Sequence, residues 1–264
     1  MIKVVVCGAL GRMGGTVAKL ASDASDLELV GGVDMRPGTV CGAGVVASDQ
    51  IDRLLTDKKP DVLVDFTAPA ASVENAKAAA RHNVSLVVGT TGFTPRQREE
   101  MRRAVEASVP AVISSNFSVG VNIYWFLVRE AAKKLGDYDI EVIEAHHRNK
   151  KDAPSGTAKT ILEILDSEVG ARPKLYGREG MMERGKEIGV HVIRGGDIVG
   201  EHTVLFAGNY ECIDLTHRAY DRSVFAMGAL RAIRWVGGKK PGVYSMADVL
   251  NLHPKQEAAS LSKG

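Results

Sequence analysis

The chain has 264 residues, of which 45% are hydrophobic, enough for the core of one large globular domain or of two modest ones. Its net charge of +2 excludes the strong positive field of a nucleic-acid or anionic-membrane protein, and its 5% aromatic content argues against a base-stacking surface. No apolar stretch approaches the ~20 residues of a membrane span. Three isolated cysteines and an N-terminus without a signal-peptide pattern predict a cytoplasmic protein without disulfides.

Strand and helix patterns alternate in the first part of the chain. Apolar runs predict strands at 2–7, 27–34, 61–66, 86–88 and 111–113, and periodic apolar residues predict helices at 12–24, 70–83 and 95–108. This alternation is typical of a parallel sheet with helices on both faces. The predicted fold class is therefore α/β, with a Rossmann-type doubly wound parallel sheet.

The pattern changes after about residue 116. Helices are predicted at 121–135 and 157–169, on either side of a strand at 139–143. Strand-like segments at 190–194, 202–206 and 211–216 then precede a final helix at 224–237. We expect a second α+β domain with a mostly antiparallel sheet at 117–227. Domain one would be 1–116, completed by 228–252, with hinges near 116–120 and 226–228 and a flexible tail at 253–264.

A glycine-rich turn, Gly8-Ala9-Leu10-Gly11-Arg12-Met13-Gly14, follows the first predicted strand and opens the first helix. Asp34 closes the second strand, 20 residues after Gly14 (34 − 14). This is the context of a dinucleotide-binding fingerprint, in which glycines admit the pyrophosphate and the acidic residue binds a ribose hydroxyl. The spacing departs from G-x-G-x-x-G because Leu10 is inserted, and the alternative is a tight turn that binds nothing.

Three further loops follow predicted strands. They are Phe66-Thr67-Ala68-Pro69, Gly89-Thr90-Thr91-Gly92 and Ser114-Ser115-Asn116-Phe117. Ligands of such sheets bind outside the carboxyl ends of the strands, so the first two loops are candidates for the nicotinamide–ribose half of a dinucleotide. The third lies at the expected domain junction. For the first two loops, simple β–α turns remain the alternative interpretation.

The segment from Glu144 to Thr157 contains His146, His147, Arg148 and Lys150 between a predicted strand and a helix start. Free N–H groups at a helix start attract carboxylates or phosphates, cations add charge, and histidine exchanges protons near neutral pH. We expect a site for a small anionic substrate that must also be protonated. The two histidines should have different roles, because neighbouring side chains of an extended segment alternate sides.

Several residues of this region have other interpretations. Arg148 could pair with Glu144 or Asp152 instead of a substrate, and Lys151 is expected to be solvated. Three other histidines, His191, His202 and His217, are expected to be structural or interface residues. No grouping of His, Cys and carboxylates has metal-ligand spacing, so we predict no metal.

The segments at 8–14, 89–93, 116–122, 144–157 and 196–203 resemble those of the 4-hydroxy-tetrahydrodipicolinate reductase family, long called dihydrodipicolinate reductases, of lysine and diaminopimelate synthesis. The likeness extends to about Leu252. It implies NADH or NADPH on the first domain, and a second domain that binds the substrate and builds a homotetramer. The implied reaction reduces a cyclic unsaturated imine dicarboxylate with loss of water, leaving an electron-rich centre that needs a proton.

The resemblance also implies residue roles. His146 is similar to the family's acid/base residue and Lys150 to its proton donor. His147, Gly156 and Thr157 are similar to its substrate binders, and Arg148 is a further residue of suitable charge. With the loops above, the expected cofactor residues are Gly8, Ala9, Leu10, Gly11, Arg12, Met13, Asp34, Phe66, Thr67, Gly89, Thr90, Thr91, Ser114, Ser115, Asn116 and Phe117.

Asp34 favours NADH, because its charge would repel a 2′-phosphate. Many family members have an arginine directly after this acidic residue, where the chain has Met35. We therefore expect NADH with some NADPH use. Two alternative functions are another amino-acid oxidoreductase, such as an aspartate or homoserine dehydrogenase-like enzyme, and a non-catalytic NADH-sensing module.

Overall fold

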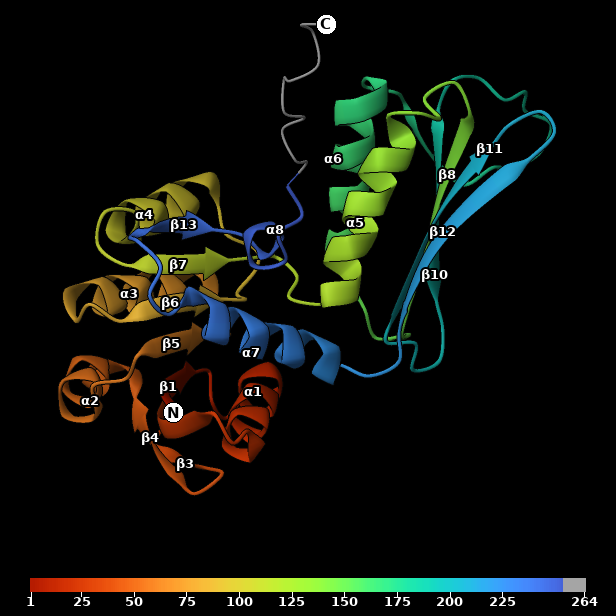
Figure 1. The fold of residues 1–264 in the computed structure, drawn as a ribbon. Helices are drawn as coiled ribbons and strands as arrows, with labels where there is room; N and C mark the ends of the chain where they lie inside the picture. Colours follow the sequence, from red (N-terminus) through yellow and green to blue (C-terminus); the bar gives the residue numbers. More distant parts are fainter. Residues whose placement is uncertain (254–264) are drawn as a thin grey trace, which may run out of the picture.

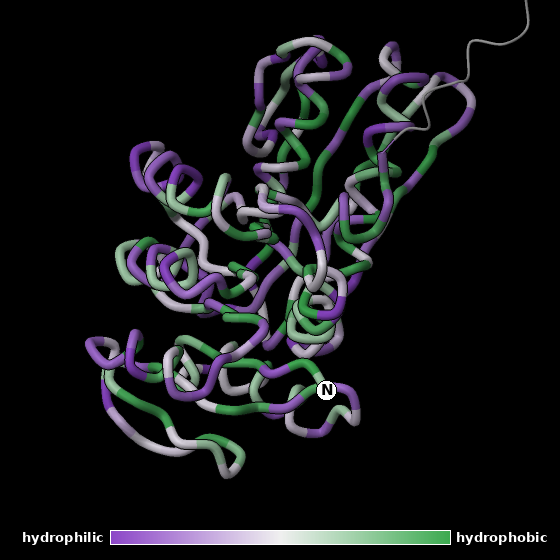
Figure 2. Tube along the Cα trace, turned by 60° about the vertical axis from the view of Figure 1, so that its left-hand side comes forward, coloured by the Kyte–Doolittle hydropathy of each residue, from purple (hydrophilic) through white to green (hydrophobic). Residues whose placement is uncertain are grey.

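The computed structural model describes residues 1–253, so all of the predicted tail except His253 lies outside the described residues. The described chain forms two sheets with helices packed on them (Figure 1). Hydrophobic residues gather toward the inside of the trace, and hydrophilic residues lie toward its periphery (Figure 2). No helix of residues 1–253 is long and apolar enough to cross a membrane.

The first sheet has eight strands in the order β13-β7-β6-β5-β1-β2-β4-β3. All neighbouring strands run parallel except β3 and β4. The strands are β1 (Ile2–Cys7), β2 (Leu27–Asp34), β3 (Gly38–Val40), β4 (Ala43–Ala47), β5 (Val62–Asp65), β6 (Ser85–Val88), β7 (Pro110–Ile113) and β13 (Gly242–Tyr244). The chain proceeds outward from β1 to β2 and then crosses to β5 on the other side, so the strand order reverses between β1 and β5.

Helices cover both faces of this sheet. One face packs against α1 (Arg12–Asp23), α7 (Ser223–Val236) and α8 (Met246–Val249), and the other against α2 (Ile51–Lys58), α3 (Pro69–Arg81) and α4 (Pro95–Val105). The central strands are apolar on both sides and fully buried, as at Val62–Val64, because both faces are covered. The doubly wound parallel sheet is thus confirmed. The sequence did not predict α2 or the β3–β4 hairpin.

The second sheet has the strand order β12-β11-β8-β10-β9. Its strands are β8 (Asp139–His146), β9 (Lys174–Tyr176), β10 (Ile188–Arg194), β11 (Gly200–Ala207) and β12 (Cys212–Ala219). Two helices, α5 (Val119–Ala132) and α6 (Gly156–Val169), pack on one face and stand beside the first unit (Figure 1). The antiparallel pairs expected from the sequence are present on both sides of β11, whereas β10 runs parallel to both its neighbours.

The two chain crossings between the units lie against each other. A Cβ on Gly228 of α7 would lie 1.7 Å from the carbonyl oxygen of Phe117, so only glycine lets α7 approach the outgoing segment. The segments predicted as hinges, 116–120 and 226–228, are therefore in direct contact. Motion about them stays a prediction.

Candidate active site

The glycine-rich turn joins β1 to α1 at the carboxyl end of β1. Gly8 has a φ of +76°, and a Cβ there would lie 2.6 Å from the carbonyl oxygen of Phe66. A Cβ on Gly14 would lie 2.0 Å from the carbonyl oxygen of Gly8, so α1 begins directly against the turn. Gly11 caps α1 without a side-chain hydrogen bond, which leaves N–H groups at this helix start available to an anion.

Asp34 lies beside this turn at the end of β2. Its Oδ2 accepts a hydrogen bond from the backbone N–H of Leu10 at 2.9 Å, and its Oδ1 accepts one from the N–H of Met35 at 2.7 Å. The carboxylate therefore helps to fix the turn. Leu10 and Met35 are both exposed, so the edge of this part of the site is open to solvent.

The other expected cofactor loops follow β5, β6 and β7, which succeed one another from β1 in the sheet. The Phe66 ring fills the space over Gly89, where a Cβ would lie 2.1 Å from a ring carbon, and its centroid is 6.0 Å from that of Phe117. Thr90 and Phe117 are buried, which leaves little of either side chain for a ligand to contact. Thr91 and Ser115 are exposed at the same edge.

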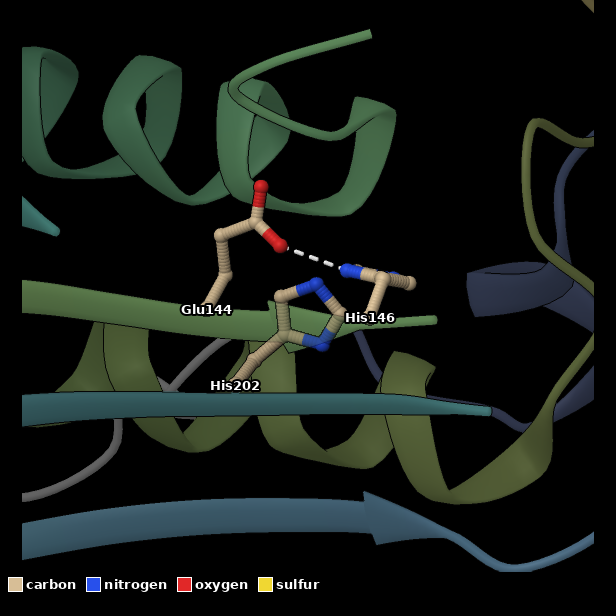
Figure 3. A group of neighbouring side chains, drawn as sticks. All are labelled: Glu144, His146 and His202. Carbon is tan, nitrogen blue, oxygen red and sulfur yellow. Dashed lines mark hydrogen bonds and ion pairs between the residues drawn. The ribbon is translucent and has the colours of Figure 1, made fainter. Parts of the chain in front are cut away.

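Glu144 and His146 share one face of β8, because side chains two residues apart along a strand point to the same side (Figure 3). Glu144 is fully buried, and its Oε2 lies 2.5 Å from Nδ1 of His146. A carboxylate only accepts hydrogen bonds, so Nδ1 carries the proton and Nε2 is left for proton exchange.

Three further donors satisfy Glu144. Nη1 and Nη2 of Arg194 each lie 2.8 Å from one of its oxygens, and the backbone N–H of Ser155 donates to Oε1 at 2.9 Å. Burial by itself raises the pKa of Glu144, but the hydrogen bonds from His146 and Arg194 outweigh it and lower the pKa to about 2. Glu144 is therefore ionised at neutral pH.

His202 on β11 packs edge-on against His146, with the ring centroids 5.1 Å apart (Figure 3). The Ser155 hydroxyl accepts from the N–H of Ala158 at 3.2 Å, so its hydrogen can donate to Nε2 of His202 at 3.0 Å. Burial, and then the charge of His146, lower the pKa of His202 to about 3. The sequence predicted a structural or interface role for His202, and the structure places it beside the expected acid/base residue.

Glu144, His146 and His202 each bring one potential metal ligand within 4.8 Å of the others. Spacing along the sequence did not indicate this grouping, because only the pairing of β8 with β11 brings these distant residues together. The guanidinium of Arg194 binds Glu144 through two hydrogen bonds and would repel a cation there. We interpret the cluster as a hydrogen-bonded network, and the absence of a metal stays a prediction.

Cations from several segments surround His147. Its Nε2 lies 3.3 Å from Nη2 of Arg222, which precedes α7. Partial burial lowers the pKa of His147, followed by the charges of Arg222, His146, Lys150 and Arg12. Arg12 belongs to the glycine turn, so the two units face each other across this positive region. Arg222 was not predicted, because no local motif marks it and only the return of α7 brings it here.

The expected cofactor and substrate residues meet at one contact between the units. Nδ2 of Asn116 lies 3.3 Å from Oγ1 of Thr157, in the first turn of α6. Oδ1 of Asn116 accepts a hydrogen bond from the N–H of Ser118 at 2.9 Å, which fixes the amide orientation. Gly156 is exposed at the start of α6, and the side chain of Ser155 caps this helix.

The structure also decides the pairing of the cations in this loop. Lys150 pairs with Asp152 at 2.9 Å, and Arg194 pairs with Glu144. The alternative in which Arg148 pairs with either acid is therefore wrong. Arg148 and Lys151 are both exposed, and substrate binding by Arg148 stays a prediction.

A Rossmann-type sheet whose strand ends face a histidine- and cation-rich loop of a second unit defines a nicotinamide-dependent oxidoreductase with an anionic substrate. Family models agree with this class. The model described as dihydrodipicolinate reductase, N-terminus, matches residues 2–117, and the one described as dihydrodipicolinate reductase, C-terminus, matches residues 120–250. The chain therefore belongs to the dihydrodipicolinate reductase family.

Individual relatives support the same family. The 4-hydroxy-tetrahydrodipicolinate reductase of Methanoregula boonei is 70% identical over 96% of this chain and 99% of its own length. That of Methanoculleus marisnigri is 68% identical over 96% of this chain and 100% of its own length. The dipicolinate-bound dihydrodipicolinate reductase from Paenisporosarcina sp. TG-14 has a TM-score of 0.80 at 26% identity and covers 94% of this chain and 98% of that one.

Proposed function

We propose that this chain carries out its reductase reaction with the cofactor on the first unit and the substrate against the second. The reaction is the NAD(P)H-dependent reduction of 4-hydroxy-tetrahydrodipicolinate to tetrahydrodipicolinate, with loss of water, in diaminopimelate and lysine biosynthesis. The contact of Asn116 with Thr157 carries this assignment, because it joins the end of β7 to the start of α6. In this proposal 1–116 with 228–252 form the cofactor domain, and 117–227 the substrate domain.

The first unit fits a dinucleotide cofactor. The uncapped start of α1 offers backbone donors to a pyrophosphate, Gly8 and Gly14 keep the turn free of side chains, and Asp34 is placed for a ribose hydroxyl. The loops after β5, β6 and β7 are placed for the nicotinamide–ribose half. The nicotinamide supplies the hydride when bound.

NADH is the preferred coenzyme in this proposal. Asp34 would repel a 2′-phosphate, and a like-charge contact of ~1 kcal/mol corresponds to about fivefold in affinity. We expect a KM for NADH about fivefold below that for NADPH, and an Asp34→Ser variant that narrows the difference. Steady-state kinetics with both coenzymes measure this. A wild-type enzyme that prefers NADPH would contradict the assignment of Asp34.

The substrate site combines a helix start with a cationic loop. Backbone N–H groups of Gly156 and Thr157 can hold one carboxylate, since helix starts favour anions. Lys150, His147 and Arg222 supply positive charge or hydrogen bonds for the other carboxylate. The bond from Lys150 to Asp152 keeps the ammonium at this end of β8.

His146 and Lys150 carry out proton transfer in this proposal. Glu144 holds His146 with Nδ1 protonated, so Nε2 is the atom that exchanges a proton with the substrate. Lys150 donates the proton that the reduced ring requires. Glu144 acts through His146 and is a positioning residue.

Planar ring dicarboxylates test this substrate site. We expect pyridine-2,6-dicarboxylate to inhibit competitively with the substrate, and Arg222→Ala to raise its inhibition constant about tenfold through loss of one charged contact. Arg231→Ala is the matched control, because it removes an exposed arginine of α7, the helix that Arg222 precedes. Initial-rate measurements give both constants. An inhibition constant that Arg222→Ala leaves unchanged, or that Arg231→Ala raises by as much, would remove Arg222 from the site.

The outer face of the second sheet is available for self-association. Within residues 1–253 no helix packs on the outer face of the second sheet, and Ile193 on that face is 49% exposed. Such a face supports self-association, and we propose a homotetramer, which light scattering would measure. The three free cysteines, Cys7, Cys41 and Cys212, suit the reducing cytoplasm where we place the enzyme.

A further inference from the structure

Asp65 is the last residue of β5 and is fully buried. It lies at the carboxyl end of the strand that neighbours β1, where the strand order of the first sheet reverses. No ion pair of the described residues involves Asp65, so neutral groups surround this carboxyl. A buried acid in such a place requires hydrogen bonds from its neighbours.

Those hydrogen bonds come from two loops and a helix. Thr67, in the loop after β5, approaches Oδ1 with its N–H at 3.1 Å and its hydroxyl at 2.9 Å. Thr90, in the loop after β6, approaches the same oxygen with its hydroxyl at 2.6 Å. Nδ2 of Asn75 on α3 donates to Oδ2 at 2.6 Å. One carboxyl thus joins three segments.

The two loops are also joined directly. The N–H of Thr67 lies 2.9 Å from Oγ1 of Thr90, so Asp65, Thr67 and Thr90 form a closed triangle of hydrogen bonds. The hydroxyls of both threonines are turned toward Asp65 and not toward a ligand. Their backbone groups, with the peptides of Gly89 and Thr91 on either side of Thr90, are what the loops can offer to a cofactor.

We propose that Asp65 is a positioning residue for the nicotinamide–ribose half of the cofactor. By binding Thr67 and Thr90 together it sets the backbone of both loops at the strand ends. The adenine half rests on different groups, the glycine turn and Asp34, at β1 and β2. This inference depends on the proposed cofactor site, and it predicts that loss of Asp65 weakens one half of the cofactor selectively.

The test compares NADH with ADP, which lacks both the nicotinamide and the ribose attached to it. We expect Asp65→Asn to raise the Kd of NADH about tenfold, as the loss of one strong hydrogen bond implies, and to leave that of ADP within about twofold. Isothermal titration calorimetry on the full chain gives both constants. Asp61→Asn is the matched control, because Asp61 accepts the N–H of Lys3 at 2.7 Å near the opposite end of the same strand.

A pair of threonine variants keeps the test decisive if Asp65→Asn does not fold. Thr90→Val removes the hydroxyl at nearly constant shape, and Thr90→Ser retains it. We expect Thr90→Val to weaken the binding of NADH and Thr90→Ser to retain it, with the binding of ADP unchanged in both variants. An equal rise in the Kd of both ligands, or no rise in the Kd of NADH, would overturn the role of Asp65. A wild-type chain that bound neither ligand would instead overturn the proposed cofactor site.

Discussion

Lys150→Ala and His146→Gln are each expected to reduce kcat by ~10²–10⁴-fold, the usual contribution of a positioned proton donor or acceptor. Binding of NADH should stay nearly unchanged, because both residues lie on the second unit and the glycine turn on the first. A coupled assay measures kcat: the preceding synthase condenses aspartate semialdehyde with pyruvate, and NADH oxidation is followed.

Lys151→Ala is the control for Lys150→Ala, because it removes an exposed cation from the next position. Its kcat should stay close to that of the wild type. Collapse of NADH binding in the Lys150 or His146 variants would show that the division into cofactor and substrate units is wrong. Normal turnover in both would assign proton transfer to other groups.

Glu144→Ala is expected to lower the free energy of unfolding by about 3–5 kcal/mol, because it leaves the buried end of Arg194 without its partner. Glu144→Gln should keep the shape, destabilise less, and reduce kcat by ~10–100-fold, because an amide cannot hold His146 as the carboxylate does. Chemical denaturation and the coupled assay measure the two effects separately.

The stabilisation by Glu144 also has a defined pH range. Its folded-state pKa of about 2 lies below the value of about 4.3 in an unfolded chain, so its contribution is complete above that value. We expect the stability difference between wild type and Glu144→Gln to persist at pH 7 and to shrink only as pH falls from about 4.3 toward the folded pKa. A difference that already vanished at pH 6 would contradict this.

Glu141→Gln is the matched control on the same strand. Glu141 binds Arg184 and His191, which resembles the set held by Glu144, but its odd position places it on the opposite face of β8. It should lose stability without the change in kcat. A similar fall in kcat for both variants would indicate a general effect on β8.

Local patterns predicted the elements that position the cofactor. The apolar runs ending at Cys7 and Asp34 and the turn between β1 and α1 have direct signatures in sequence, and the structure has these elements where they were expected. The α2 helix was missed although Ile51, Leu54 and Leu55 recur at helical spacing, because it is only eight residues long. The β3–β4 hairpin was missed because its strands have only three and five residues. The parallel pairing of β10 was missed because strand direction depends on how the chain crosses between strands and not on side-chain alternation.

The sequence by itself determined the family and indicated the candidate residues of the loop after β8, because a glycine turn and a cluster of histidines and cations are each contiguous in the chain. Only the tertiary structure decided which groups complete that chemistry. Sheet pairing places Arg194 on Glu144, His202 beside His146 and Asp65 beneath two loops. The return of α7 places Arg222 at His147. Hydrogen bonds and charges act over a few ångströms in space, and only folding brings distant positions of the chain within that range.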